Sequence, residues 1–252
     1  MRRERIDKLL VERGLADSRT KAQAMVMAGV VLVNDQRVEK ASEQFPTDSQ
    51  IRIKHADDPT SRYVGRGGLK LEAALREFQI DVRGAVCLDV GASTGGFTDC
   101  LLQHGAKHVF AIDVGHGQLA WKLRQDPRVV VMEKTNARYL TAAQFPKPFS
   151  PDDLIVADCS FISLRKILPP AVPLLRPAGR IVALVKPQFE AGKEAVSRGR
   201  GVIRDAAVRE RAIGDARLAV TNAGFVIHAE IDSALPGPKG NVERFLYAGR
   251  GP

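Results

Sequence analysis

Two charged residues follow directly on apolar runs that have the length of buried strands. Asp158 follows the apolar run 154–157, and Lys186 follows the apolar run 181–185. In open α/β folds, ligands bind in the crevice at the carboxyl ends of the strands, so an acid and an amine at those ends would face a bound ligand. Either residue taken singly could instead cap a helix or carry surface charge.

A glycine-rich turn follows a third apolar run, 85–90, and opens a segment of helical pattern. Its spacing over residues 91–96, Gly-x-x-x-Gly-Gly, differs from the Gly-x-Gly-x-x-Gly of dinucleotide sites. This departure weighs against a pyrophosphate and favours S-adenosylmethionine (SAM), whose carboxylate and sulfonium need no phosphate clamp. A turn that serves packing alone is the alternative. The residues expected around this cofactor are Asp89, Gly91, Ala92, Ser93, Thr94, Gly95, Gly96 and Phe97.

Asp113 ends the next apolar run, where an acid accepts hydrogen bonds from the ribose hydroxyls of an adenosine cofactor. Asp89, just before the glycine turn, can hold the amino-acid portion. The following strand end flanks the adenine in this fold, which makes residues 133–136 candidates and Asn136 the expected contact. Asp158 is expected to contact the cofactor as well. A nicotinamide dehydrogenase would instead carry a shorter glycine loop and a Tyr-Lys or His pair, and neither is evident.

Two further segments depart from the helix and strand patterns around them, and each carries one ionisable residue. Residues 65–72 form a glycine run that opens a helix and carries Lys70. Residues 236–243 form a Pro-Gly-rich turn that feeds the last strand and carries Glu243.

These residues must be positioned by a sheet buried on both faces. The runs 85–90, 109–113, 129–132, 154–158 and 181–186 are nearly continuous in apolar residues and are separated by helix-length segments. This alternation predicts a Rossmann-like α/β domain with a mostly parallel sheet. Two more strands, 225–232 and 242–247, bring the expected number to seven.

The first 55 residues have a different character. Apolar residues at helical spacing predict helices over 5–13 and from about 17 to Gly29, with Gly14 ending the first. A hairpin follows, with strand 30–34, a turn at 35–36 and a return over 37–40, and then a strand at 51–54. We therefore expect a small α+β domain over 1–55, a linker over 56–62 and a catalytic domain over 63–252.

Composition narrows the class of protein. The net charge of +9 favours a polyanionic partner or an anionic membrane surface. No apolar run of about 18 residues and no signal-peptide core are evident, so we expect a cytoplasmic protein. The three cysteines, Cys87, Cys100 and Cys159, lack disulfide or metal spacing, and no metal is expected.

The N-terminal segments resemble the RNA-binding domain first described in ribosomal small-subunit protein four. The matching segments are 5–10, Gly14-Leu15, Ser18-Arg19 and 29–34. The resemblance implies that basic side chains of the second helix and the hairpin reach an RNA backbone, although a solvated charged surface would look the same. The expected RNA contacts in this domain are Arg5, Arg19, Lys21 and Arg37. Others are expected at Arg66 and, on a basic glycine-containing loop within 186–204 that orders on RNA, at Lys193, Arg198 and Arg200.

Nearly the whole chain resembles the TlyA family, which is also named hemolysin A. The segments that carry this resemblance are 66–71, 89–99, 158–164, 185–190 and 237–243. It implies a SAM-dependent, FtsJ-related ribose 2′-O-methyltransferase of ribosomal RNA, with a cytidine target. The family's catalytic Lys-Asp-Lys-Glu set falls on Lys70, Asp158, Lys186 and Glu243. Gly65 and Ala234-Leu235 depart from the family pattern without touching this set.

A ribose hydroxyl is a poor nucleophile at neutral pH, and this chemistry leads to a hypothesis for the roles of the four residues. Lys186 would contact the hydroxyl as base or oxyanion stabiliser, Asp158 would orient Lys186 and favour the sulfonium, and Lys70 and Glu243 would position Lys186 and the ribose.

Four rival functions make different demands. Base N-methylation usually uses Asp/Asn-Pro-Pro-Tyr/Phe, whereas residues 158–161 lack both prolines. Base C-methylation needs a cysteine nucleophile, for which Cys159 is in range. A membrane-active cytolysin would need a spanning helix, a barrel-type alternation or a secretion signal. A non-catalytic RNA-binding factor would not need the four-residue set.

Overall fold

The computed structural model divides the chain into two compact units, Met1–Arg62 (unit 1) and Tyr63–Pro252 (unit 2). It describes residues 3–27, 29–34, 36–53, 62–147, 149–150, 152–192, 201–237 and 239–251. Within those residues, none of the helices combines the length and the apolar character that crossing a membrane requires.

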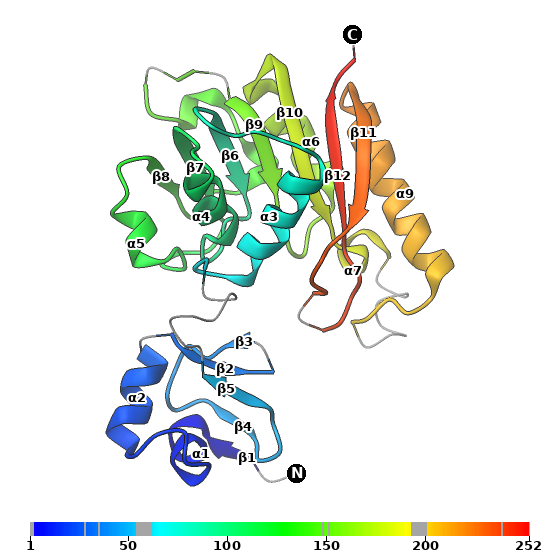
Figure 1. Cartoon of the computed structure of the whole chain (residues 1–252). Coiled ribbons are helices and arrows are strands. Elements are labelled where there is room, and N and C mark those ends of the chain that lie inside the picture. The colour runs from blue at the N-terminus through cyan, green and yellow to red at the C-terminus, as the bar shows by residue number, and fades with distance from the viewer. Residues whose placement is uncertain are drawn as a thin grey trace. The chain divides into compact units, whose positions relative to one another are not determined.

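Unit 1 packs two helices against short strands (Figure 1). In α1 (Ile6–Glu12), Ile6, Leu9 and Leu10 lie on one face and are buried. The glycines at 14 and 29 follow the two helices with positive φ values of 66° and 72°, as the sequence predicts for helix ends. The remaining elements are α2 (Arg19–Met27), β1 (Arg3–Arg5), β2 (Val31–Val33), β3 (Gln36–Arg37), β4 (Gln44–Pro46) and β5 (Ile51–Ile53).

The strands of unit 1 form two small antiparallel sheets, β3-β2-β5 and β1-β4. A hairpin and the strand near residue 51 are both present, with Leu32 opposite Arg37 and Val31 opposite Ile53. The return strand is Gln36–Arg37 rather than the predicted 37–40, and Gln36 pairs with Val33 instead of lying in the turn. The pairing of β1 with β4 is not predicted from the sequence, because each strand is three residues long and partly exposed and so shows no alternation.

Unit 2 contains the seven-stranded sheet that the apolar runs predict. Its order is β11-β12-β10-β9-β6-β7-β8, and β12 alone runs against its neighbours. The strands are β6 (Val86–Val90), β7 (His108–Ile112), β8 (Val129–Met132), β9 (Asp152–Ala157), β10 (Leu175–Val185), β11 (Phe225–Asp232) and β12 (Arg244–Arg250). The expected mostly parallel Rossmann-like fold is thereby confirmed.

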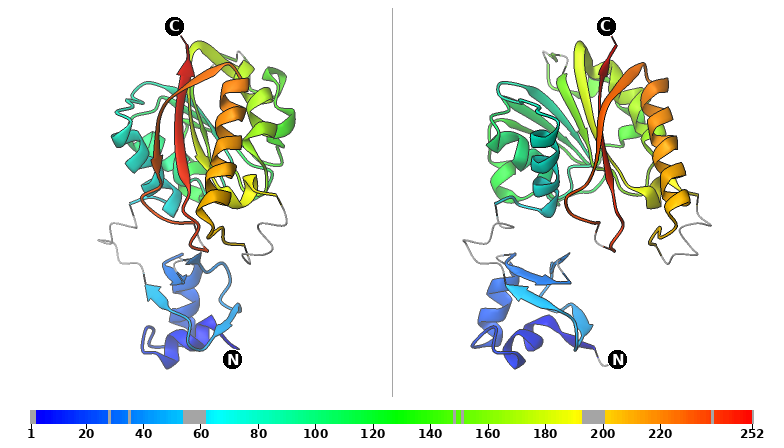
Figure 2. Two further views of the ribbon diagram at one scale, coloured as in Figure 1. Left: turned by 90° about the vertical axis from the view of Figure 1, so that its right-hand side faces the viewer. Right: turned by 45° about the vertical axis from the view of Figure 1, so that its right-hand side comes forward.

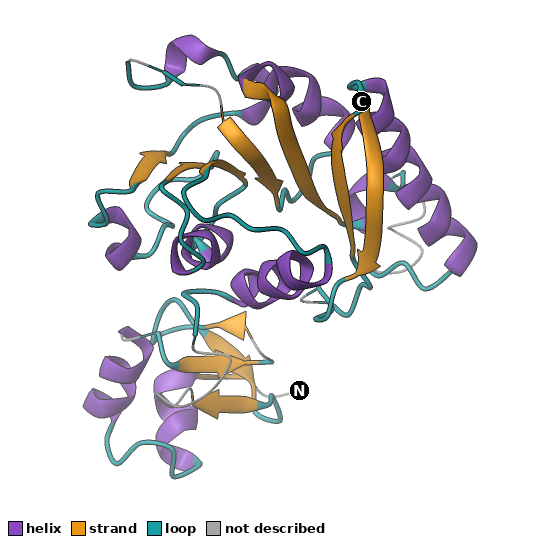
Figure 3. Ribbon diagram, turned by 45° about the horizontal axis from the view of Figure 1, so that its top comes forward, coloured by secondary structure: helices purple, strands orange, loops and turns teal. Residues whose placement is uncertain are grey.

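Helices cover both faces of this sheet (Figures 2 and 3). On one face, α3 (Arg66–Glu77) and α4 (Gly96–Gln103) pack Leu71, Phe97 and Leu101 into one apolar cluster. On the other, α6 (Leu164–Ala171) and α9 (Ala206–Asn222) contribute Ile167 and Ile213 to a second cluster. The short helices α5 (Trp121–Arg124) and α7 (Pro187–Glu190) complete the unit.

The chain order creates a switch point between β6 and β9. From β6 the chain moves outward to β7 and β8 and then returns to β9 on the other side of β6. The loops after β6 and β9 therefore leave the sheet in opposite directions and open a crevice at the carboxyl ends of these strands. The glycine turn follows β6 and Asp158 follows β9, so the topology brings them together.

At the opposite, amino-terminal end of the sheet, Asp152 opens β9 as a fully buried carboxyl. Neither of its oxygens has a hydrogen-bond partner in the described part of the chain. Burial, and then the charge of Asp153, raises the pKa of Asp152 to about 8 from 3.8.

A raised carboxyl pKa means that folding favours the protonated form. The stability that this preference contributes is present below the unfolded-state pKa and is lost as the pH rises through about 8. Asp152→Asn is expected to raise the melting temperature at pH 8 more than at pH 5, because Asn has no charge to bury. Thermal unfolding at the two pH values measures this. An equal change at both would show that ionisation of Asp152 does not limit stability.

Candidate functional site

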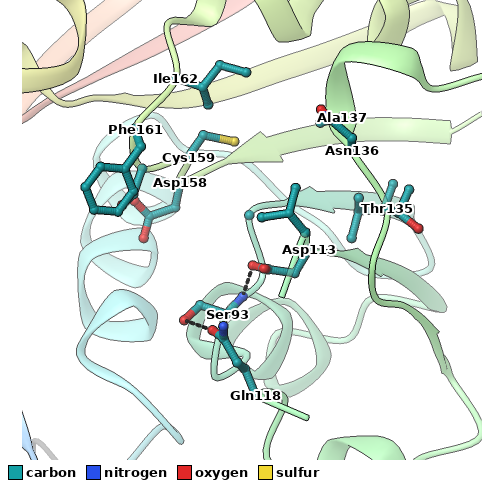
Figure 4. A pocket seen from close by; sticks show the side chains of 14 residues that line it. Ser93, Asp113, Gln118, Thr135, Asn136, Ala137, Asp158, Cys159, Phe161 and Ile162 are labelled. Atoms are coloured by element: carbon teal, nitrogen blue, oxygen red, sulfur yellow. Dashed lines mark hydrogen bonds between the residues drawn. The ribbon is translucent and has the colours of Figure 1, made fainter. Parts of the chain in front are cut away.

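A pocket of about 320 Å³ opens at the switch point (Figure 4). Figure 4 shows Asp158 and Phe161 on one side of the pocket and Asp113 and Ser93 on the other. Of the residues that the sequence predicts for a cofactor, those that line the pocket are Gly91, Ser93, Asp113, Asn136 and Asp158. Ala92, Thr94, Gly95, Gly96, Phe97 and Asp89 do not line it.

The glycines of the turn allow close approaches that a side chain would block. Gly91 has φ +89°, and a Cβ there would lie 2.9 Å from the carbonyl oxygen of Asp158. A Cβ on Gly96 would lie 2.9 Å from the backbone nitrogen of Gly68. Gly91 thus joins the turn to β9, whereas Gly96 lets the first turns of α3 and α4 touch. Both glycines therefore serve packing within the domain, and the binding of a cofactor by the turn stays a prediction.

The carboxylate of Asp113 is fixed by two backbone N–H groups. Ser93 donates to one oxygen over 2.8 Å and Gly115 to the other over 2.7 Å. The side chain of Gln118, which also lines the pocket, lies 3.3 Å from the Ser93 hydroxyl oxygen (Figure 4). The oxygens of Asp113 keep further lone pairs for a diol, and the bonds that they accept hold the carboxylate at the pocket wall.

Asp89 lies inside the domain core. Its side chain is fully buried and accepts a 2.6 Å hydrogen bond from the Thr98 hydroxyl, while its second oxygen has no partner among the described residues. Burial raises the pKa of Asp89 to about 7. Asp89 thus joins β6 to α4 through Thr98 and does not line the pocket, where contact with the amino-acid portion of a cofactor was expected.

The strand end after β8 contributes Asn136 to the pocket wall. Its side-chain oxygen accepts a 3.1 Å hydrogen bond from the backbone N–H of Arg138. Glu133 instead holds the neighbouring loop through an ion pair with Arg124 and a hydrogen bond from the Gln118 backbone. The pKa of Glu133 is lowered to about 2, and the hydrogen bond from the backbone N–H of Gly117 is the largest cause.

The four residues of the predicted catalytic set form two ion pairs. Lys186 Nζ lies 2.7 Å from Asp158 Oδ1, and Lys70 Nζ donates a 2.5 Å hydrogen bond to Glu243 Oε2. Lys186 and Asp158 retain 12% and 22% side-chain exposure, whereas Lys70 and Glu243 retain 8% and 0%. One pair is therefore accessible to a ligand and the other is buried.

Strand register brings the two pairs together. Val185 of β10 is opposite Arg244 of antiparallel β12, so Lys186 and Glu243 are the next positions along the two strands. The amino-terminal turn of α3, which carries Lys70, also approaches Asp158, because a Cβ on Gly67 would lie 3.7 Å from Asp158 Oδ2. The structure thus brings the two ion pairs to neighbouring strand positions, and the catalytic roles of the four residues stay predictions.

Three features of the site were not predicted from the sequence. Phe161 lines the pocket at 90% exposure with φ +65°, and its ring lies 4.8 Å from that of Phe189. Ser160 accepts a 3.0 Å hydrogen bond from Lys186 Nζ. Glu190 accepts a 2.9 Å hydrogen bond from the Leu164 backbone and so joins α7, which follows β10, to the start of α6, which follows β9. The closeness of Phe161 and Ser160 to Asp158 in the sequence could have suggested these two residues. No comparable signal points to Glu190.

Cys159 is poorly suited to act as a nucleophile although it lines the pocket. Its thiol donates to the Val90 carbonyl oxygen over 3.3 Å, and burial raises its pKa to about 12. Because the thiolate is the reactive form, Cys159→Ser is expected to keep methyl-transfer activity within about threefold of wild type. Steady-state kinetics test this, and loss of turnover would instead support covalent base methylation.

The predicted RNA contacts are distributed over both units. In unit 1, Arg5 and Arg19 pair with Asp7, and Lys21 pairs with Asp17. Arg37 belongs to β3, and its side chain lies outside the described part of the structure, as do the residues Lys193, Arg198 and Arg200. In unit 2, Arg66 donates to the Pro236 carbonyl oxygen over 3.5 Å.

A seven-stranded, mostly parallel sheet with this pocket at its switch point defines unit 2 as a Rossmann-like, SAM-dependent methyltransferase domain. The FtsJ-like methyltransferase family model matches residues 63–250, and the S4 domain model matches residues 4–51. The chain belongs to the FtsJ-like methyltransferase family and, within it, to the TlyA group that also carries an S4 domain.

Individual relatives agree with this assignment. The 16S/23S rRNA (cytidine-2′-O)-methyltransferase TlyA of Mycobacterium tuberculosis is 46% identical over 98% of this chain and 90% of its own. Hemolysin A of Brachyspira hyodysenteriae is 43% identical over 96% of this chain and 98% of its own. A solved Streptococcus thermophilus structure, provisionally assigned as a hemolysin, superposes with a TM-score of 0.74 at 42% identity and covers 99% of this chain and 89% of its own.

Proposed function

We propose that this chain uses SAM to methylate a ribose 2′-hydroxyl of ribosomal RNA, with a cytidine as the target nucleotide. The convergence of the ion pairs Lys186–Asp158 and Lys70–Glu243 beside the pocket carries the proposal. The name of the 46% identical TlyA relative, an rRNA (cytidine-2′-O)-methyltransferase, supports the substrate. A ribosomal RNA substrate also implies a cytoplasmic location.

The pocket suits an adenosine-bearing cofactor. Asp113 would accept hydrogen bonds from the ribose diol, and Asn136 and the apolar Ile162 would flank the adenine. Asp89 precedes the turn, and its oxygen without a partner among the described residues would, when ionised, favour a positively charged amino group by its field rather than by contact. SAM, when bound, supplies a methyl group on a positively charged sulfur.

Lys186 is the residue best placed to act on the hydroxyl. Asp158 and Ser160 hold its ammonium group, which would otherwise sample many rotamers at a strand end. Lys186 would contact the 2′-hydroxyl, either as a neutral amine that takes its proton or as an ammonium that stabilises the oxyanion. Asp158 also faces the pocket, where its negative charge would favour the sulfonium. Lys70 and Glu243 would fix the neighbouring strand end that positions Lys186 and the ribose.

Phe161 offers a surface for the target base. Its ring is almost fully exposed at the pocket rim, although an aromatic residue gains most free energy when buried. A left-handed backbone conformation there is also costly for a bulky residue. Both costs are offset if a nucleobase stacks on the ring in the RNA complex.

Mapping of ribose methylation on ribosomal RNA tests the function directly. RNA from cells that lack the gene is expected to lose ribose methylation at one or more cytidines. Complementation with the wild-type gene should restore it, and complementation with Lys186→Ala should not. An unchanged methylation map in the gene-deleted cells would contradict the proposal.

A further inference from the structure

Asp7 is a buried acid that holds two arginines on the surface of unit 1. Its side chain is 0% exposed. One oxygen accepts from Arg5 Nε at 3.0 Å, and the other accepts from Arg5 Nη2 at 2.9 Å, Arg19 Nη2 at 3.0 Å and Gln23 Nε2 at 3.1 Å. The Arg5 hydrogen bonds are the largest cause that holds the pKa of Asp7 well below its usual range. Asp7 therefore stays ionised and keeps both arginines bound.

The two arginines keep donors that these bonds do not use. Their side chains are 36% and 52% exposed, for Arg5 and Arg19 respectively. Nη1 of Arg5, and both Nε and Nη1 of Arg19, lie outside the hydrogen bonds to Asp7. Because both groups bind the same oxygen, the guanidinium groups lie side by side and come from the starts of α1 and α2.

We propose that Asp7 is a positioning residue that orients Arg5 and Arg19 as one pre-formed grip for the backbone phosphates of RNA. This inference rests on the proposed function, because it takes RNA as the ligand of unit 1. Arginine suits phosphate because its planar fork donates two parallel hydrogen bonds. Each mobile arginine loses rotamer entropy on binding, at a cost of about 0.5–1.5 kcal/mol. Asp7 imposes that order before RNA arrives.

If Asp7 has this role, its substitution should change RNA affinity in the direction opposite to that expected from charge alone. Removal of a negative charge from a domain that binds a polyanion should tighten binding. Asp7→Asn removes one negative charge but releases the two arginines, so we expect RNA affinity to fall by about tenfold, from the ordering cost of two side chains.

Asp17→Asn is the matched control. Asp17 is 82% exposed and pairs with Lys21 at 2.5 Å in the same unit, so the change in charge is identical. It is expected to leave RNA affinity unchanged or to raise it. The measurement is filter binding to transcribed 16S and 23S ribosomal RNA, with thermal unfolding of each variant as a check on folding. Tighter or unchanged binding by a folded Asp7→Asn variant overturns the inference.

A charge-preserving variant keeps the test decisive if Asp7→Asn does not fold. Arg19→Lys retains the positive charge but loses the planar fork, and it is expected to weaken binding about fivefold in the wild-type background. Unchanged affinity of Arg19→Lys overturns the inference. If wild type methylates ribosomal RNA but the Asp7 and Arg19 variants bind normally, only the positioning role fails. If wild type neither binds nor methylates ribosomal RNA, the proposed function fails with it.

Discussion

Lys186→Ala is expected to lower the rate constant for methyl transfer about 10³-fold, which is within the range that a positioned acid or base contributes. In the structure, Lys186 is held by Asp158 at 2.7 Å and by Ser160 at 3.0 Å, and Ala removes the amine from this arrangement. Single-turnover assays with saturating RNA measure the rate.

The binding of SAM is expected to persist in the same variant. Lys186 does not line the pocket, whereas Asp158 does. Calorimetric titration should therefore give a SAM affinity close to that of wild type. Ser160→Ala is the matched control, because it removes one contact of Lys186 but keeps the amine, and it should cost far less activity. Turnover that survives Lys186→Ala would defeat the assignment of this lysine.

Glu243→Gln is expected to lower both stability and activity, because it leaves Lys70 buried without a charged partner. Removing one member of a buried ion pair typically costs about 3–5 kcal/mol of unfolding free energy. The near-complete burial of Lys70 and Glu243 places this pair in that class. Urea unfolding measures the loss, and methyl transfer is measured at a temperature where the variant is folded.

A double variant separates the structural role of this pair from its catalytic role. Lys70→Met with Glu243→Gln removes both charges, so most of the lost stability should return. Methyl transfer should remain low if the pair positions Lys186 and the ribose. A double variant with wild-type turnover would show that Lys70 and Glu243 serve folding alone.

The sequence predicts the centre of the site well because strand ends are easily recognised. An apolar run such as 181–185 must be buried, and in a parallel sheet the carboxyl ends of the strands lie at the same edge. Lys186, Asp158 and Asp113 could therefore be placed at one edge before any contact was known. The antiparallel pairing of β12 with β10 places Glu243 opposite Lys186, which the sequence did not predict.

Features that depend on tertiary packing could not be predicted in this way. The burial of Asp89 depends on how α4 covers the glycine turn, which spacing alone does not reveal. The exposure of Phe161 depends on a single left-handed backbone angle, and aromatic residues are more often buried. The hydrogen bond from Leu164 to Glu190 joins helices α6 and α7 through residues that are 26 positions apart, and nothing in either segment indicates its partner.

The contact between Gly96 and Gly68 links the glycine turn beside the pocket to the helix that carries Lys70. Gly96 belongs to the turn that borders the pocket, and Gly68 lies two positions before Lys70 on α3. Any side chain introduced at residue 96 would push the two helices apart and displace Lys70 from Glu243. A redesign of the glycine turn for bulkier methyl-donor analogues therefore cannot treat it as a separate module, since enlarging it at residue 96 would also disturb the Lys70–Glu243 pair that we propose positions the acceptor.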